Sequence, residues 1–366
     1  MRLGVAAAVV DGSLVPGDVA IDDGVFSGVG LAPAGRGLAA PGFVDLQVNG
    51  FAGVDLLVAD PAGYAQAGQA LARTGVTAYQ PTFISSPLDT CQEALSTLAA
   101  LDGTYRGPRI LPAHLEGPFL SPRRHGAHDP ANLRPIDLAV ADALCDAGPV
   151  GFMTVAPELD GGLELIAYLA RRGIVVSLGH SDAGTDVAAA AFDAGAEAVT
   201  HIFNAMRPWQ PRDPGLSGLA MTRPDVFVMA IVDNVHLAPE TAELLVAVAT
   251  GRLVLVSDAI EAAGLGDGTY RLGDRTVHVN GPVARLADGT LAGSVLAMDK
   301  AVRNLVEHGA SVEVAVDAAT RVPARLVRRE DVGSIRIGAA ADVVVLDDAL
   351  EVSRTLVGGR ELHAAA

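Results

Sequence analysis

Residues 151–178 read GFMTVAPELDGGLELIAYLARRGIVVSL, and this stretch shows how the chain is built. Apolar runs of strand length occupy residues 151–156 and 174–178, and the segment between them has the Leu- and Ala-rich composition of a helix. Because strands that alternate with helices pair in parallel through right-handed crossovers, this stretch predicts one strand–helix–strand unit. The chain is therefore expected to have an α/β fold.

The same unit recurs through most of the chain. Eight apolar runs of strand length alternate with helical segments: Phe43–Val48, Ala78–Phe83, Ile110–Leu115, Gly151–Ala156, Ile174–Leu178, Ala198–Ile202, Val226–Val232 and Leu253–Val256. Eight units over roughly 290 residues predict a closed (β/α)8 TIM barrel, which typically takes about 250 residues. A doubly wound open sheet is the alternative, but it favours a glycine-rich phosphate loop after its first strand, and residues 47–50 (QVNG) are not one.

Both ends of the chain contain short β-like runs that are broken by turn residues. These runs are Leu3–Val10, Asp18–Ile21, Val25–Gly30, Asp342–Leu346 and Glu351–Val357. Since chain termini often lie close together, residues 1–40 and 334–366 are expected to form one small β-sandwich domain beside a barrel over residues 41–333. Turn signals at residues 273–274 and 280–281 predict a β-hairpin insertion at about residues 270–291.

Composition narrows the range of partners. The formal net charge is −17, and a chain this acidic repels nucleic-acid phosphates, so no nucleic-acid partner is expected. No segment approaches the roughly 18 uninterrupted apolar residues of a membrane span. Cys91 and Cys145 lack CxxC spacing and are interpreted as buried small apolar side chains. The first residues do not form a signal-peptide pattern, and the cytoplasm is the expected location.

The polar residues that follow the predicted strands carry the functional signal. Glu116 follows the third strand, His180 the fifth, His201 the sixth and Asp258 the eighth. Each alone has an ordinary explanation, such as a helix cap, but active sites of these barrels lie where the C-terminal ends of the strands converge. One carboxylate and two imidazoles predict a catalytic site for one divalent metal ion. Zn²⁺ is expected, and Fe²⁺, Co²⁺ or Ni²⁺ would also suit these ligands.

This arrangement suits hydrolysis of an amide. A bound ion lowers the pKa of its water from about 15.7 towards 7. Asp258 is placed to take the proton of that water and to return it to a leaving amine, and the loop residue His128 is expected to help stabilise the oxyanion. The single lysine, Lys300, lies outside the predicted fourth strand, so no lysine is available there to bridge two metals. Gln47 and Asn49 replace a His-x-His pair on the first strand, beside the metal ligands, and this also indicates one metal.

Five motifs together resemble one known family. They are residues 41–50 (PGFVDLQVNG), 114–118 (HLEGP), 179–181 (GHS), 200–206 (THIFNAM) and 256–259 (VSDA). Their order and spacing resemble the N-acetylglucosamine-6-phosphate deacetylase family of the amidohydrolase superfamily, and the likeness covers almost the whole chain. The resemblance implies a metal-dependent hydrolase that removes the acetyl group from N-acetyl-D-glucosamine 6-phosphate to give glucosamine 6-phosphate and acetate.

The resemblance also implies roles for residues around the reacting amide. Glu116, His180 and His201 would hold the metal. Asp258 would be the general base and then the general acid, and His128 would polarise the acetyl carbonyl.

Further residues match substrate-binding positions of the family. Asn204 and Ala205 match positions that line the sugar site, and His236 matches one near the phosphate. Arg212 matches an arginine that reaches the phosphate across a homodimer interface, which suits an acidic chain that must bind an anion. One departure lies next to His236, since residues 233–236 read DNVH where the family usually has Asp-Gly-x-His.

Three alternative functions remain open at the level of the sequence. The first is the same reaction on N-acetylgalactosamine 6-phosphate, because nothing in the sequence separates the two epimers. The second is another amidohydrolase that acts on a small N-acyl substrate. The third is a catalytically inactive regulator that binds a sugar phosphate, but such a protein is expected to have lost Asp258 or a metal ligand, and all four groups are present.

Overall fold

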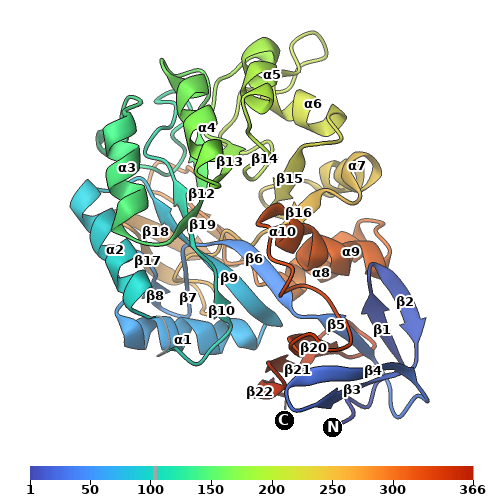
Figure 1. The fold of residues 1–366 in the computed structure, drawn as a ribbon. Helices are drawn as coiled ribbons and strands as arrows, with labels where there is room; N and C mark the ends of the chain where they lie inside the picture. Colours follow the sequence, from blue (N-terminus) through green and yellow to red (C-terminus); the bar gives the residue numbers. More distant parts are fainter. Residues whose placement is uncertain (102–104, 366) are drawn as a thin grey trace.

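The computed structural model describes residues 1–101 and 105–365, and its centre is a barrel of parallel strands (Figure 1). The wall runs in order through β6 (Phe43–Val48), β9 (Val76–Ile84), β11 (Ala113–Glu116), β12 (Val150–Val155), β13 (Val175–Leu178), β14 (Ala198–Val199), β15 (Phe227–Ala230) and β16 (Leu253–Leu255). Each neighbouring pair along this path is parallel. The predicted (β/α)8 barrel is therefore confirmed.

The third predicted strand is interrupted. Its first part forms β10 (Arg109–Ile110) and its second part β11, and both pair with β9. Pro112 lies between them, and a proline has no N–H to donate to a sheet ladder.

The barrel closes between β16 and β6 through residues just beyond the ends of the regular strands. The backbone N–H of Asp258 donates to the Gln47 carbonyl at 2.9 Å, and the Asn49 N–H donates to the Ala259 carbonyl at 2.8 Å. The Ser257 N–H donates to the Asp45 carboxylate at 3.1 Å. The closure thus fixes Gln47, Asn49 and Asp258 relative to one another.

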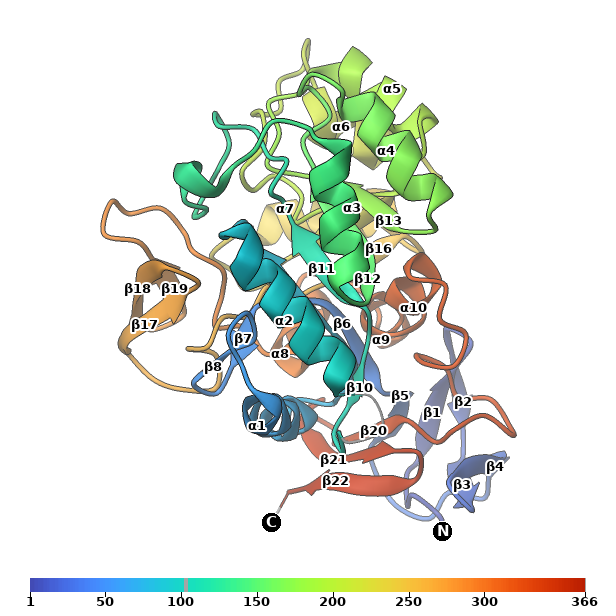
Figure 2. The same cartoon turned by 60° about the vertical axis from the view of Figure 1, so that its left-hand side comes forward.

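Helices surround the barrel wall on the outside (Figures 1 and 2). They are α1 (Pro61–Ala72), α2 (Leu88–Ala100), α3 (Leu138–Ala147), α4 (Gly162–Arg171), α5 (Thr185–Asp193), α6 (Gly215–Thr222), α7 (Pro239–Ala249), α8 (Met298–Glu307), α9 (Val312–Ala319) and α10 (Arg321–Leu326). In α4 the buried residues Leu165, Ile166 and Leu169 recur at helical spacing and form the face that packs on the core. Burial of each such side chain contributes about 1.5–3 kcal/mol.

The two chain ends meet in one small β domain, as predicted. Its main sheet has the order β2 (Ser13–Pro16), β1 (Ala7–Val10), β5 (Leu38–Pro41), β20 (Val343–Leu346), β21 (Val352–Val357) and β22 (Arg360–Ala364). A second ribbon of β3 (Asp18–Asp22) and β4 (Val25–Leu31) supplies Val19 and Phe26 to a core shared with Val343 and Leu356. Figure 1 shows both termini at this domain. The domain boundaries at 40/41 and 333/334 stay a prediction.

The insertion after β16 is larger than the predicted hairpin. It is a three-stranded antiparallel sheet of β17 (Gly268–Leu272), β18 (Arg275–Asn280) and β19 (Val283–Arg285). Its apolar residues, such as Leu272 and Val277, pack with Ile84 and Ala127, which belong to segments near the C-terminal ends of the barrel strands. The β17–β19 sheet therefore stands beside the mouth of the barrel (Figure 2).

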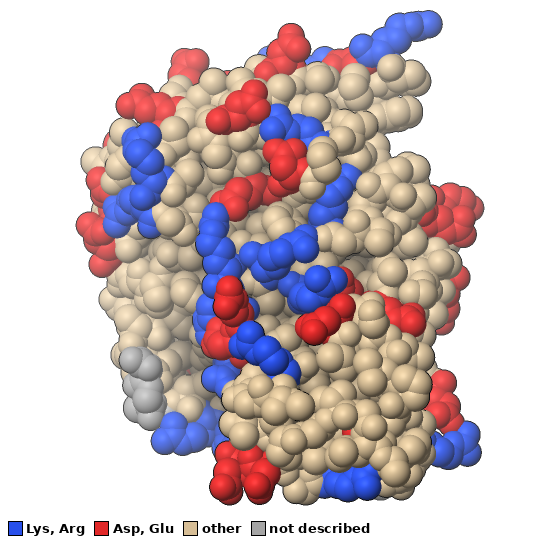
Figure 3. Space-filling view, turned by 45° about the vertical axis from the view of Figure 1, so that its right-hand side comes forward, with Lys and Arg blue, Asp and Glu red and all other residues tan. Residues whose placement is uncertain are grey.

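Basic and acidic side chains are interleaved on the molecular surface. Figure 3 shows arginine and lysine side chains around a hollow on one face, with acidic side chains among them. Several arginines have carboxylate partners within 3 Å, including the pairs Arg321–Asp317, Arg223–Asp193 and Arg328–Glu197. Within the described residues, none of the helices has the length and apolar character needed to cross a membrane.

Candidate active site

Three buried side chains converge above the barrel. Glu116 is the last residue of β11, and His180 and His201 each lie two residues beyond their strands, β13 and β14. Both histidines have positive φ, 47° and 29°, a conformation that is uncommon for residues other than glycine. Glu116 Oε1 lies 3.1 Å from His180 Nε2 and 2.8 Å from His201 Nε2, and the two nitrogens are 3.2 Å apart. The structure thus brings the three predicted metal ligands together.

The chemistry of these three groups fits a cation. His180 Nδ1 lies 2.9 Å from the Arg124 carbonyl, which can only accept, so Nδ1 carries the proton. Without a cation, Nε2 can donate to the Glu116 carboxylate only when the ring carries a second proton; in the neutral ring its lone pair faces the carboxylate, and a cation between them would relieve this repulsion. Burial by itself would raise the pKa of Glu116, but its hydrogen bonds with His180 and His201 hold that pKa well below its usual range. Glu116 is therefore an anion that is ready to bind a cation.

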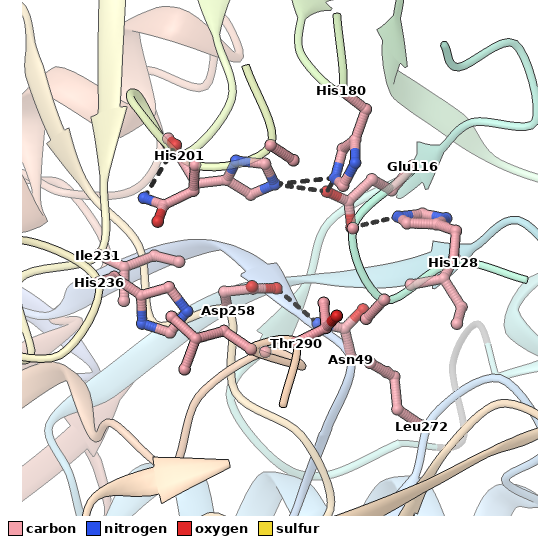
Figure 4. A pocket seen from close by; sticks show the side chains of 17 residues that line it. Asn49, Glu116, His128, His180, His201, Ile231, His236, Asp258, Leu272 and Thr290 are labelled. Carbon is pink, nitrogen blue, oxygen red and sulfur yellow. Dashed lines mark hydrogen bonds and ion pairs between the residues drawn. The ribbon is translucent and has the colours of Figure 1, made fainter. Parts of the chain in front are cut away.

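Asp258 lies at the barrel closure and faces this cluster within the same cavity (Figure 4). Its Oδ1 accepts a hydrogen bond of 2.7 Å from Asn49 Nδ2, and its backbone is held in place by Gln47. Burial, followed by the nearby charge of Glu116, raises the pKa of Asp258 to about 7. A carboxylate with a pKa near neutrality can both accept and return a proton.

His128 is fixed as a neutral hydrogen-bond donor. The Ser85 N–H donates to His128 Nδ1 at 3.2 Å, so Nε2 carries the ring proton. His128 Nε2 lies 3.9 Å from Glu116 Oε2 and lines the same cavity. Burial lowers the pKa of His128 to about 3, so the ring stays neutral at physiological pH. Such an N–H suits an oxygen that becomes negative during a reaction.

Gln47 and Asn49 touch two different carboxylates. Gln47 Nε2 donates to Glu116 Oε1 at 3.2 Å, and Asn49 donates to Asp258. Two amides thus stand where a His-x-His pair would supply two further metal ligands. Their contacts orient the two carboxylates.

A cavity of about 310 Å³ is lined by Asn49, Asp258, His128 and the three clustered residues Glu116, His180 and His201. Asn204, Ala205 and His236, which the sequence indicates as substrate-binding candidates, also line it. His236 donates from Nδ1 to Asp233 Oδ2 at 2.7 Å, which leaves its Nε2 as the second ring nitrogen available for contacts. Figure 4 shows His128 and His236 at opposite sides of the cavity, with Asp258 between them.

Arg212, another predicted site residue, does not line this cavity. It lies in an exposed turn between β14 and α6. Within one chain the structure therefore does not bring Arg212 to the other site residues, and its role across a dimer interface stays a prediction.

The sequence matches one known protein family over most of its length. The family model described as the amidohydrolase family matches residues 38–362. The chain belongs to the amidohydrolase family. Its match includes the whole barrel and most of the C-terminal part of the β domain.

Relatives of this amidohydrolase are named as deacetylases of N-acetylated amino-sugar 6-phosphates. The chain is 40% identical over 340 residues to N-acetylglucosamine-6-phosphate deacetylase of Mus musculus, which covers 89% of this chain and 83% of the relative. It is 35% identical to N-acetylgalactosamine-6-phosphate deacetylase of Escherichia coli O157:H7, with 93% of both chains covered. The family resemblance expected from the five motifs is thus confirmed.

A solved structure extends the likeness to three dimensions. A mutant of N-acetyl-D-glucosamine-6-phosphate deacetylase from Mycobacterium smegmatis, in complex with N-acetyl-D-glucosamine-6-phosphate, has a TM-score of 0.92 and 35% identity. The alignment covers 99% of each chain. The fold of this amidohydrolase is therefore shared over its full length with a substrate-bound relative.

Several residues of the cavity were not predicted from the sequence. The lining includes Leu272, Thr290 and Leu291 from the insertion after β16, and the position of that insertion over the mouth carries no local sequence signal. Ser85 and Arg124 orient His128 and His180 through backbone groups, which every residue type possesses. The Asp233–His236 spacing is the one local pattern that could have indicated an oriented histidine.

Proposed function

We propose that this amidohydrolase removes the acetyl group from N-acetyl-D-glucosamine 6-phosphate to give glucosamine 6-phosphate and acetate. The observation that carries the proposal is the cavity in which Glu116, His180 and His201 face Asp258 and His128. The activity for which the relatives are named and the sugar phosphate bound to the solved relative support the choice of substrate.

The metal in this proposal is one divalent ion held by Glu116, His180 and His201. Zinc is proposed, because a four-coordinate site with three protein ligands suits it, although Fe²⁺, Co²⁺ and Ni²⁺ accept the same ligands. When bound, the ion makes hydroxide available near neutral pH and polarises the amide carbonyl.

The chain's own residues handle the protons. Asp258 accepts a proton from the water that attacks the acetyl carbon, and it later gives this proton to the sugar nitrogen as the C–N bond breaks. The Nε2–H of His128 donates to the carbonyl oxygen, which becomes negative in the tetrahedral intermediate. Asn49 keeps the Asp258 carboxylate turned towards the cavity. The oxygen of the attacking water thus ends in acetate, and the proton that Asp258 carried ends on the amine of glucosamine 6-phosphate.

Substrate recognition is assigned to the other side of the cavity. Asn204 and Ala205 are proposed to line the sugar, and His236 to contact the phosphate. Arg212, from a second copy of the chain, is proposed to complete the phosphate site in a homodimer. The exposed Trp209, three residues before Arg212, provides apolar surface in support of such an interface.

The cytoplasm is proposed as the compartment. Both cysteines, Cys91 and Cys145, are free thiols, which suits a reducing environment. The proposed partner of the active site is a small-molecule amino-sugar phosphate.

A second candidate is the same reaction on N-acetylgalactosamine 6-phosphate. The relative from Escherichia coli O157:H7 favours it, because the alignment covers nearly all of both chains. Another small N-acyl substrate is a weaker alternative, since it would leave His236 and Arg212 without an anion to bind.

The test is acetate release by the metal-loaded enzyme from four compounds: the two N-acetylhexosamine 6-phosphates and their unphosphorylated forms. We expect the highest kcat/KM with N-acetyl-D-glucosamine 6-phosphate, and loss of activity after chelation with recovery on adding Zn²⁺. Preference for the galactosamine epimer would select the second candidate. Equal rates with and without the phosphate would refute the phosphate site.

A further inference from the structure

The turn after β15 presents His236 to the cavity, and Asp233 organises this turn from the inside. Asp233 Oδ1 accepts hydrogen bonds from the N–H groups of Val235 at 2.8 Å and His236 at 2.7 Å. Its Oδ2 accepts the bond from His236 Nδ1. One carboxylate therefore fixes both the backbone of the turn and the orientation of the imidazole.

Helix α8 holds the same turn from the outside. Asn304 Nδ2 donates to the Val232 carbonyl at 2.7 Å, and His308 Nε2 donates to Asn234 Oδ1 at 2.6 Å. Asn304 and His308 are four residues apart at the end of α8, so they lie on one face of the helix. Their relative exposures are 1% and 8%; the Asn304 bond is buried, and the His308 bond is part-buried because its acceptor residue, Asn234, is exposed. We call these two contacts the α8 clamp.

Two features of the clamp are uncommon. Asn234 has a φ of 64°, in the left-handed region, which asparagine adopts more readily than most residues other than glycine. Asn304 Oδ1 is buried and has no hydrogen-bond partner among the described residues, which lowers stability. Strain and unsatisfied polar groups concentrate where a structure fixes a functional geometry. The clamp therefore suits a role in placing His236 better than a role in general stability.

We propose that Asn304 and His308 are positioning residues for substrate recognition, which act by holding the turn that aims His236. This inference rests on the proposed contact between His236 and the substrate phosphate. Neither residue lines the cavity, so both act through the turn and not by touching the substrate.

Hydrogen–deuterium exchange tests the clamp without reference to any substrate. His308→Leu and Asn234→Gly each remove the His308–Asn234 bond, and Gly retains access to positive φ. Asn234→Asp keeps an acceptor for His308 and serves as the matched control. We expect peptides that contain residues 232–237 to exchange at least about fivefold faster in the first two variants, because a net hydrogen bond of about 1 kcal/mol corresponds to that factor. Unchanged exchange in this segment would overturn the clamp.

Kinetics then test what the clamp does. In His308→Leu and Asn234→Gly, the kcat/KM for the phosphorylated sugar is expected to fall about fivefold relative to the unphosphorylated sugar, and Asn234→Asp is expected to match wild type. The double variant should lose no more than either single variant, because both remove the same bond. An equal loss with both substrates would indicate general packing and refute the positioning role. If wild type turns over neither compound, the proposed function fails, and the exchange result still decides the clamp.

Discussion

The ionisation of Asp258 depends on a few neighbouring groups. Burial and the charge of Glu116 raise the pKa of Asp258 to about 7, and the hydrogen bond from Asn49 acts in the opposite direction. A general base must be deprotonated, so kcat/KM is expected to fall as the pH drops through this pKa. A cation beside Glu116 offsets its charge, and we therefore expect the midpoint of the acid limb at or below about pH 7.

Asn49→Leu provides the check. Loss of the hydrogen bond removes a contribution that lowers the pKa of Asp258, so the acid limb of the pH profile is expected to move to higher pH. Asp258→Asn should lose about 100-fold or more in kcat and show no such limb. Profiles of kcat/KM against pH for the three proteins measure both effects. A limb that stays in place in Asn49→Leu would mean that another group titrates.

Asp45 makes a separate contribution to the pH dependence of stability. It is buried at the barrel closure, and burial raises its pKa from 3.8 to about 6 despite hydrogen bonds from Ser257 and Gln47. Between these values the folded state binds more protons than the unfolded state, so Asp45 lowers stability as the pH rises through this window. The shift corresponds to about 3 kcal/mol, lost by pH 7.

Asp45→Asn stays neutral and should not show this loss. Relative to wild type, the variant is expected to gain about 2 kcal/mol in free energy of unfolding between pH 4 and pH 7, because the unfolded carboxyl is already more than half ionised at pH 4. Denaturant titrations at the two pH values measure the difference, with the exposed Asp160→Asn as a control that should track wild type. A constant difference between Asp45→Asn and wild type would contradict the argument.

Single residues were predictable where a strand end marks them. Glu116, His180, His201 and Asp258 each follow an apolar run, and the barrel brings such positions together. The tautomer of His128 was not predictable, because it depends on the backbone N–H of Ser85, a residue distant in sequence. The sequence alone therefore indicates which groups meet, but not which nitrogen carries the proton.

At the scale of elements, a buried polar layer links the four strands that lead to Glu116, His180 and His201. His114 Nε2 lies 2.7 Å from Thr154 Oγ1, which lies 2.8 Å from Thr200 Oγ1, which in turn lies 2.6 Å from Ser177 Oγ. These residues belong to or immediately follow β11, β12, β13 and β14, and all four are 0% exposed. The layer thus ties together the strands that carry Glu116, His180 and His201.

Thr154→Val tests the energetic weight of this layer. The substitution keeps the shape of the side chain but removes the hydroxyl that contacts both His114 and Thr200. The free energy of unfolding is therefore expected to fall by about 1–3 kcal/mol. The matched control is Thr77→Val on β9, because the Thr77 hydroxyl is equally buried but has no partner among the described residues. Chemical denaturation of both variants measures the effect. Equal destabilisation in the two would show that the hydrogen bonds of the layer contribute nothing.

The existence of the strands was easier to predict than their ends and connections. Apolar runs indicate a strand, but β14 has only two residues in the ladder where the sequence indicated Ala198–Ile202. The difference arises because His201 and Phe203 adopt positive φ, which ends the ladder and turns the loop into the cavity. Similarly, β19 extends the predicted hairpin through pairing with β18, and its short three-residue run gave little signal.

At the scale of the whole molecule, the barrel and the joined chain ends could be predicted from the order of strand and helix signals in the sequence. The number of copies did not follow, because a dimer interface depends on surface shape and not on periodicity. Arg212 shows the difference. One chain leaves it exposed and away from the cavity, so its proposed contact with the phosphate requires a second copy.

Complementation between two impaired variants, assayed at a substrate concentration below the wild-type KM, tests this contact. Arg212→Ala is expected to raise the KM for the phosphorylated sugar at least about tenfold, since a charge-assisted contact to phosphate is lost. Asp258→Asn removes the base from its own site but retains Arg212. When the two variants are unfolded, mixed and refolded together, half of the dimers are mixed in a random assembly, and each mixed dimer has one complete site. Activity is therefore expected to recover to about a quarter of the wild-type value, whereas activity that stays at the sum of the separate variants would place Arg212 outside the partner's site.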